Sequence, residues 1–155
     1  MTQADWIYAA GFFDGEGCVI IHLRKAILPR GVTRQYMVRV HVTNTNAEVI
    51  RWFKDTFGGN ISTQPPRPRR RRAWKWNAAS RMCEAFLIGV RPHLKIKAAE
   101  ADCALELQAR ISATKKRPHP GFWGQPSIEP EELDRREALR VRLLELRDPH
   151  YEVCN

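Results

Sequence analysis

Two acidic side chains lie two residues apart in the segment Asp14-Gly15-Glu16-Gly17, directly after an apolar stretch. If that stretch forms a helix, both carboxylates lie at its negative C-terminal end, where they cost roughly a few tenths of a kcal/mol. Hard oxygen ligands at a tight turn suit Mg²⁺, which binds one or two carboxylates together with carbonyl, water and phosphate oxygens. A surface turn in which glycine ends a helix has the same composition. The segment alone therefore indicates either a metal site or a turn.

The helix that carries these acids is predicted over residues 4–13, and its side chains are apolar almost all round. A helix of this kind must be buried on every side. Gly11 and Gly15 lie four positions apart, on one face. Glycine inside a helix costs up to ~1 kcal/mol relative to alanine, but it lets another backbone approach closely. A second helix packed against this face would explain both glycines.

The balance of charge predicts a polyanionic partner. The 155 residues include 26 Lys and Arg against 17 Asp and Glu, a formal net charge of +9. Such an excess favours nucleic acid. An anionic membrane surface is the alternative, but the basic residues do not gather on one amphipathic helix, and no apolar run approaches the ~20 residues of a membrane helix. We therefore expect a nucleic-acid partner and no membrane.

The N-terminus and the cysteines bear on the compartment. Residues 1–5 contain no basic region followed by an apolar stretch, so no secretory signal is predicted and the protein is expected not to be secreted. The four cysteines lie far apart without a C-x-x-C pair, which argues against a zinc ribbon and a disulfide scaffold. Free thiols are the expectation for Cys18, Cys83, Cys103 and Cys154.

The remaining elements predict an α+β domain spanning residues 1–155, with a core of about residues 4–111 and a helical C-terminal extension of about 112–155. Four strands are expected to form one antiparallel sheet with helices on one face only. After the first helix, the elements expected are strands at 18–24 and 35–43, a helix from the Thr45–Glu48 capping box to Phe57, strands at 60–64 and 73–77, helices at 80–90 and 94–111, and a final helix that ends near Arg147 with Pro130 in its first turn.

The strand at 35–43 alternates strictly, with Tyr36, Val38, Val40 and Val42 on one face and polar side chains on the other. This pattern indicates one buried face and one open face. A nine-residue strand spans roughly 30 Å, close to one turn of duplex DNA, so the open face is either solvated or reads base edges. The candidate reading set is Ile20, His22, Arg24, Gln35, Met37, Arg39, His41, Asn60, Ser62, Gln64, Lys75 and Asn77.

A basic loop separates the last two predicted strands. Its prolines and adjacent arginines exclude a helix or a central strand. We expect these arginines to contact phosphate, which adds affinity and salt dependence but no sequence information. They are Arg67, Arg69, Arg70, Arg71 and Arg72. The neighbouring pair Trp74 and Trp76 is expected in the core.

The segment Ala9-Ala10-Gly11-Phe12-Phe13-Asp14-Gly15-Glu16-Gly17 resembles the LAGLIDADG motif of homing endonucleases, with Ala9 where leucine is usual. Three other features resemble that family. They are Val42-Thr43-Asn44 before a helix, Phe57-Gly58-Gly59 after it, and Pro92-His93-Leu94-Lys95-Ile96-Lys97 before a long helix. The resemblance covers about residues 6–111 and implies the family's αββαββα fold, with the sheet on DNA. The C-terminal helix lies outside it, and packing on the sheet edge and contact with the DNA backbone both remain open for it.

The resemblance also implies roles for individual residues. One motif per chain implies a homodimer packed through Ile7, Ala10, Gly11, Asp14 and Gly15. Glu16 would bind the metal beside the carbonyl of Gly15, while Asp14 would be a less certain catalytic partner, with a structural role at the helix ends as its alternative. Asn44 would order water near the scissile phosphate, although it could equally help to cap the next helix. Lys97 would stabilise developing charge, and a solvated helix residue is its alternative.

The implied activity is Mg²⁺-dependent, site-specific cleavage of both strands of a long pseudo-palindromic DNA, leaving short 3′ overhangs. Mn²⁺ is expected to substitute, and Ca²⁺ to support binding without cleavage. Double-stranded DNA and a second copy of the chain are the expected partners, no small-molecule substrate is expected, and the compartment is cytoplasmic or organellar, wherever the host DNA lies. An RNA-binding intron maturase and a non-catalytic DNA-binding regulator are the alternatives.

Overall fold

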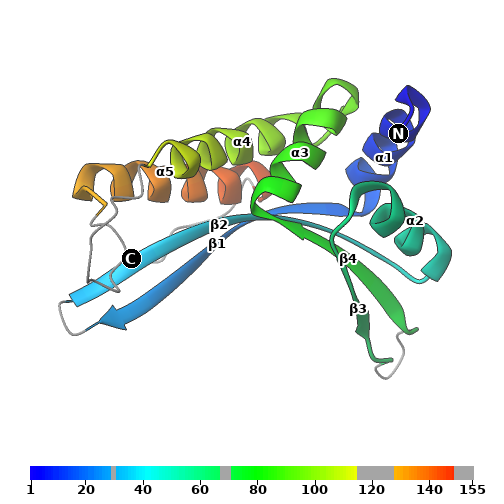
Figure 1. Ribbon diagram of the computed structural model, residues 1–155, viewed down its shortest axis with the longest axis horizontal. Helices are drawn as coiled ribbons and strands as arrows, with labels where there is room; N and C mark the ends of the chain where they lie inside the picture. Colours follow the sequence, from blue (N-terminus) through cyan, green and yellow to red (C-terminus); the bar gives the residue numbers. More distant parts are fainter. Residues whose placement is uncertain (29–30, 67–70, 115–127, 149–155) are drawn as a thin grey trace, which may run out of the picture.

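The computed structural model describes residues 1–28, 31–66, 71–114 and 128–148. It contains helices above one antiparallel sheet (Figure 1), so the predicted α+β class is confirmed. The elements are α1 (Gln3–Glu16), β1 (Gly17–Leu28), β2 (Gly31–Asn44), α2 (Ala47–Phe57), β3 (Asn60–Gln64), β4 (Ala73–Ala79), α3 (Ser80–Val90), the 3₁₀ turn η1 (Arg91–His93), α4 (Ala98–Ala113) and α5 (Pro130–Arg147). Within these residues no helix is long and apolar enough to cross a membrane.

The sheet has the strand order β1-β2-β4-β3, and each neighbouring pair is antiparallel. The β1–β2 and β3–β4 hairpins slope away from the helices in opposite directions, so the sheet forms an arch with one face covered and the other open (Figure 1). The covered face carries the apolar half of β2, Val38, Val40 and Val42, each at most 1% exposed. The alternation predicted for this strand is therefore confirmed.

The turn between α2 and β3 is fixed by backbone geometry and by a tryptophan. Gly58 and Gly59 have positive φ angles of 74° and 88°, a conformation that favours glycine. The Trp76 indole Nε1 donates to the Gly58 carbonyl at 2.7 Å, and the ring is fully buried. The predicted helix stop and the core position of Trp76 are both confirmed.

Several predicted boundaries are wrong. The first helix does not end at residue 13, because α1 continues through Asp14 and Gly15 to Glu16. Thr45 does not begin the capping box, because Asn46 is the N-cap of α2 and accepts from the backbone N–H of Glu48 at 2.8 Å. Strands β1 and β2 are longer than predicted, since their pairing continues to Leu28 and Gly31. Ladder hydrogen bonds between the two strands extend them beyond the residues with clear alternation.

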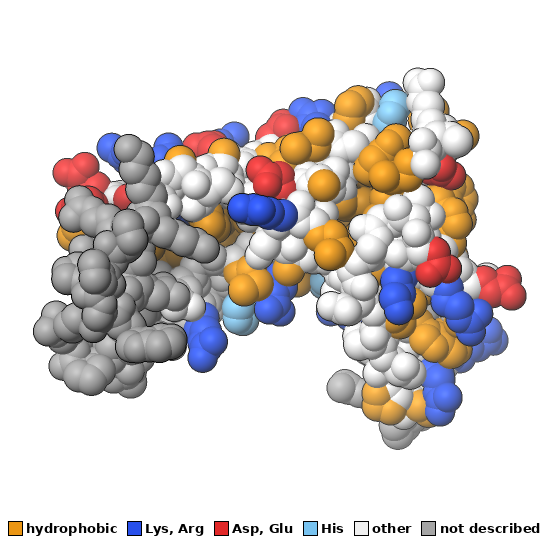
Figure 2. Space-filling model, viewed as in Figure 1, with side chains coloured by type: hydrophobic (Ala, Val, Ile, Leu, Met, Phe, Trp, Pro, Cys, Tyr) orange, Lys and Arg blue, Asp and Glu red, His pale blue; other side chains and the backbone are white. Residues whose placement is uncertain are grey.

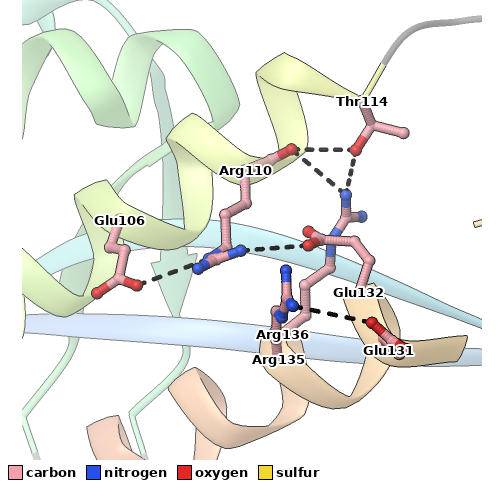
Figure 3. Close-up of polar contacts among 7 residues, drawn as sticks. All are labelled: Glu106, Arg110, Thr114, Glu131, Glu132, Arg135 and Arg136. Atoms are coloured by element: carbon pink, nitrogen blue, oxygen red, sulfur yellow. Dashed lines mark hydrogen bonds and ion pairs between the residues drawn. The ribbon is translucent and has the colours of Figure 1, made fainter. Parts of the chain in front are cut away.

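The C-terminal helix α5 packs on α4 and over the β1–β2 hairpin, on the helical side of the sheet (Figure 1). Its Leu139 and Leu143 join the core. Arg136, buried between α4 and α5, pairs with Glu132 at 2.9 Å and donates to the Arg110 carbonyl and the Thr114 hydroxyl (Figure 3). These contacts assign α5 a structural place that the sequence pattern left open.

The described cysteines Cys18, Cys83 and Cys103 are free thiols, as predicted, and burial raises the pKa of Cys83 to about 12. Cys154 lies outside the described residues.

Candidate functional site

The carboxylate of Asp14, near the end of α1, accepts hydrogen bonds from three consecutive backbone N–H groups. The donors are those of Lys95 at 2.7 Å, Ile96 at 3.2 Å and Lys97 at 3.0 Å. Burial raises the pKa of Asp14, but the three donors and the Lys97 charge outweigh it, so the net pKa lies below the usual value. Asp14 is therefore ionised and committed to a structural contact.

The segment before α4 explains why these three donors are available. Pro92 lies in the 3₁₀ turn η1, and Leu94, the residue directly after η1, has an extended backbone. Residues 95–97 precede the first turn of α4, so their N–H groups have no helical partner. The predicted helix start at Leu94 is thus wrong, because the Asp14 carboxylate holds this segment outside the helix.

Lys97 is the N-cap residue of α4, and its side chain reaches back to α1. Its Nζ donates to the backbone carbonyl of Asp14. The helix C-terminus has a partial negative charge from its unpaired carbonyls, which an ammonium group offsets. The structure therefore brings the predicted residues Asp14 and Lys97 together, with the ammonium half-buried at the end of α1.

Unlike the Asp14 carboxylate, the Glu16 carboxylate has no polar partner among the described residues. The side chain is exposed and forms no hydrogen bond or ion pair with the residues that the structure describes. The next residue must be glycine, because a Cβ at Gly17 would lie 2.2 Å from the ring of Phe13. The close approach of Gly17 to Phe13 fixes the point where α1 ends and β1 begins. The Glu16 carboxylate and the exposed backbone of Gly15 are thereby presented at this junction.

Asn44 ends β2, and its Oδ1 accepts from the backbone N–H of Asn46 at 2.8 Å. Asn44 was also considered as a residue that helps to cap the next helix. It does so here, because it binds the backbone of Asn46, the N-cap of α2. The register pairs Gly17 with Val42, so the last residues of β2 run alongside the end of α1. The Asn44 side chain is half-buried.

The described residues of one chain form no complete metal site. Across the described ranges no group of three or more His, Cys, Asp or Glu side chains is able to hold an ion. Mg²⁺ is commonly held by one or two carboxylates, with phosphate and water oxygens completing the shell. The uncommitted Glu16 carboxylate and the Gly15 carbonyl are chemically suitable as this partial donor set.

The open face of the sheet carries the predicted reading set in aligned rows. Register places Cys18, His41, Asn77 and Asn60 in one row across all four strands, and Thr43, Lys75 and Ser62 in the next. On β1 and β2 further pairs follow, namely Ile20 with Arg39, His22 with Met37, and Arg24 with Gln35. Of the predicted set, His22, Arg24, Met37, Arg39, Asn60, Ser62 and Gln64 are exposed, while Ile20, Gln35, His41, Lys75 and Asn77 are half-buried.

Lys, Arg and His side chains gather on the hollow side of the arch, between the two hairpins (Figure 2). Sequence reasoning missed Cys18 and Thr43, which belong to the same face. The signal for Thr43 was present, since it continues the alternation of Gln35, Met37, Arg39 and His41.

His41 lies at the centre of this face. Burial lowers its pKa to about 4, helped by the positive charges of Lys75 and Arg147. The imidazole is therefore neutral near pH 7 and offers one donor and one acceptor.

The basic loop is described only in part. Arg71 and Arg72 are exposed at the start of β4. Arg67, Arg69 and Arg70 lie outside the described residues.

The outer face of α1 bears on the expected contact between two chains. Ile7 is 52% exposed, and a Cβ at Gly11 or Gly15 would meet no atom within 4 Å. Nothing within one chain therefore requires glycine at these positions. Ala10 and Asp14 are buried inside the chain, so the face available to a partner consists of Ile7, Gly11 and Gly15.

Neither a family model nor a curated protein matches the chain. Solved structures do match. The homing endonuclease I-CvuI in complex with its target superimposes with a TM-score of 0.70 at 18% identity, over 94% of this chain and 83% of that one. The archaeal intron-encoded homing endonuclease I-Vdi141I complexed with DNA gives 0.70 at 16% identity, over 98% and 89%. The LAGLIDADG homing endonuclease I-GzeII in complex with a DNA target gives 0.64 at 14% identity, over 97% of this chain and 50% of that one.

Each of these likenesses covers at least 94% of this chain, at an identity of 18% or lower. This chain therefore has the fold of the LAGLIDADG homing endonucleases, as the resemblance of its Ala9–Gly17 segment predicted.

Proposed function

We propose that this protein is a site-specific DNA endonuclease that acts as a homodimer and requires a divalent metal. The observation that carries the proposal is the carboxylate of Glu16, which is exposed at the end of α1 and has no polar partner among the described residues, in a chain whose hollow sheet face carries Lys, Arg and His side chains (Figure 2). A formal net charge of +9 and the DNA complexes of structurally similar proteins support the choice of DNA as partner. Mg²⁺ is the proposed metal, with Mn²⁺ as a substitute and Ca²⁺ supporting binding without cleavage.

The homodimer is proposed from the surface of α1 and from chain length. Ile7, Gly11 and Gly15 form a smooth exposed strip that a second α1 helix would cover. I-GzeII, which is about twice as long, is matched over only half of its length, so two copies of this chain would be needed to make a comparable structure. A pair of copies would bring two Glu16 carboxylates to one axis and extend the sheet face on both sides of it.

In the proposed reaction, water displaces one phosphodiester oxygen in each strand. A bound divalent metal would supply Lewis acidity to the attacking and leaving oxygens. Glu16 and the Gly15 carbonyl would hold that ion. The ammonium of Lys97 would stabilise charge that develops on the phosphate, and Asn44 would orient the attacking water. Asp14 would fix the Lys95–Lys97 segment in place rather than take part directly.

The test is selection of cut sites from a randomised duplex library. The DNA target of a related enzyme is not a suitable substrate for this test. One I-CvuI complex, formed with the I-CreI target in 2 mM Mg, contains DNA that is not cleaved. Incubation with Mg²⁺ or Mn²⁺ is expected to cut a two-fold symmetric site of roughly two helical turns. Ca²⁺ serves as the binding-only condition.

Two variants make the test specific to the site. Glu16→Gln is expected to bind the selected DNA in Ca²⁺ and to lose cleavage with Mg²⁺. Asp55→Asn, which changes an exposed acid on α2, is the matched control and is expected to cleave normally. Binding without cleavage by the unchanged protein would refute the nuclease and favour the regulator, whereas preferential binding of a structured intron RNA would favour the maturase.

A further inference from the structure

Glu100 lies in the first turn of α4, one turn after Lys97, and is a buried carboxylate without a complete set of partners. Glu100 is only 9% exposed, and its Oε2 accepts no hydrogen bond from the residues that the structure describes. A buried acceptor without a donor is destabilising, and such atoms are few in native proteins. An unsatisfied oxygen at this position therefore calls for a donor in the working state.

Titratable or charged groups from three other elements act on Glu100 or respond to it. Asp14 of α1 and Arg147 of α5 act on it, together with Lys97 of its own segment, and Glu100 in turn acts on Cys18 of β1. Burial raises the pKa of Glu100 above its usual value, and the positive charges of Lys97 and Arg147 offset this only in part. Of the two cations, Lys97 is the one already fixed at the end of α1 by its bond to the Asp14 carbonyl.

The geometry of Lys97 leaves room for a second acceptor. An ammonium group has three N–H donors, and the Asp14 carbonyl takes one of them. Glu100 follows Lys97 by three positions and is close enough for the two charges to interact, so its unpartnered Oε2 is the acceptor that we consider for another N–H. The third N–H then has a defined direction.

We propose that Glu100 is a positioning residue for Lys97. In the DNA-bound state the free Oε2 accepts a hydrogen bond from the Lys97 ammonium, and the Asp14 carbonyl accepts the second. The remaining N–H is directed at a phosphate oxygen. The inference rests on the role proposed for Lys97 in cleavage.

A purely structural role for Glu100 predicts different behaviour. A carboxylate in the first turn stabilises a helix through the macrodipole, and that effect needs no contact with Lys97. Replacing Glu100 would then lower the melting temperature and leave the single-turnover cleavage rate of the folded protein unchanged. The two roles are therefore separated by the cleavage rate of the folded variants.

The experiment compares Glu100→Gln with Glu106→Gln, a control at an exposed acid of the same helix. The first readout is the pKa of the Lys97 ammonium, measured by NMR of its Nζ and Cε nuclei in the free protein and then in the Ca²⁺ complex with the selected DNA, which is the state that the inference concerns. Loss of a neighbouring negative charge is expected to lower that pKa by about one unit in Glu100→Gln, and Glu106→Gln is expected to leave it unchanged.

The second readout is the single-turnover cleavage rate against pH on the selected DNA. Glu100→Gln is expected to move the alkaline limb about one unit lower, with a rate about tenfold lower on that limb, and to leave the affinity in Ca²⁺ unchanged. In a Lys97→Arg background the shift is expected to vanish, because guanidinium does not titrate in this range. Glu100→Asp, which keeps the charge, is expected to keep the limb in place and serves if Glu100→Gln is poorly folded.

An unchanged Lys97 pKa in Glu100→Gln, or an equal shift in the Lys97→Arg background, would overturn the inference while leaving the nuclease intact. If the unchanged protein cuts no DNA, the proposed function fails, and the NMR titration still decides whether Glu100 acts on Lys97.

Discussion

The Lys97 ammonium donates to the backbone carbonyl of Asp14, and the Asp14 carboxylate accepts from the Lys97 backbone N–H in return. This reciprocal pair joins the end of α1 to the start of α4, which are 83 residues apart in the chain. It separates the two acids of the motif by role. Asp14 builds the junction, and Glu16 is left open at its edge.

Asp14→Asn is expected to destabilise the fold, because an amide offers one acceptor oxygen where three N–H groups now meet a carboxylate. Hydrogen bonds to charged groups contribute about 1.5–3 kcal/mol each, so a loss of about 3 kcal/mol is expected. Urea denaturation followed by circular dichroism measures it. Glu16→Gln is the matched control and should retain its stability, since its side chain is exposed and uncommitted. Equal losses in the two variants would contradict the division of roles.

The lowered pKa of Asp14 predicts that the stability of the folded protein depends on pH. The folded protein holds the Asp14 pKa below the usual value of 3.8. Its contribution to stability is therefore complete above the unfolded pKa and is lost as the pH falls through the folded pKa. Between about pH 5 and pH 2 the stability of the unchanged protein should decline more steeply than that of Asp14→Asn. If the two curves of stability against pH were parallel, the Asp14 carboxylate would not be the source of the decline.

Gly11→Leu is expected to abolish the dimer without unfolding the chain. A Cβ at position 11 points into open space, with no atom from another part of the chain within 4 Å, so we expect the isolated fold to tolerate the leucine. A second helix packed on this face would be pushed away. Sedimentation velocity should give a dimer for the unchanged protein and a monomer for the variant, with similar far-UV circular dichroism. As a control, Ala99→Leu adds the same side chain at an exposed position on α4 and should remain dimeric.

Arg71 and Arg72 are expected to contribute to affinity for DNA but not to its sequence preference. Removing one cation that neutralises a phosphate reduces the slope of log K against log salt concentration by about 0.9. Arg71→Gln/Arg72→Gln should therefore lower the slope by up to about 2 and weaken all duplexes alike. Fluorescence anisotropy at several salt concentrations tests this. A change in the ranking of base substitutions would instead assign these arginines to base reading.

Much of the fold was predictable because local signals agreed with the tertiary structure. The alternation in β2 placed Val38, Val40 and Val42 inside, and Gly58 and Gly59 marked the end of α2. The order of helices and strands followed from such signals, and the resemblance of the motif predicted the arrangement that the solved structures share.

The features that were missed depend on contacts between distant residues. No local pattern distinguishes Asp14 from Glu16, because the donors that commit Asp14 come from residues 95–97. Leu94–Lys97 has ordinary helix propensity, and it is held outside α4 by the same contact. Glu100 looks like any acid in a first helical turn until the packing of α1, α5 and β1 around it is known.

His41 is expected to make the folded protein less stable in mild acid. The pKa is about 4 in the folded chain, against 6.5 for an ordinary histidine. Because the unfolded state binds the proton first, the stability is complete above about pH 6.5 and falls as the pH decreases to about 4, below which it levels off. Urea midpoints of the unchanged protein should fall over this range, and His41→Gln, which does not titrate, should remove part of the fall. His22→Gln, an exposed histidine on the same sheet face, is the matched control. A fall that is as steep in His41→Gln as in the unchanged protein would mean that the imidazole is not held neutral by burial between β1 and β4.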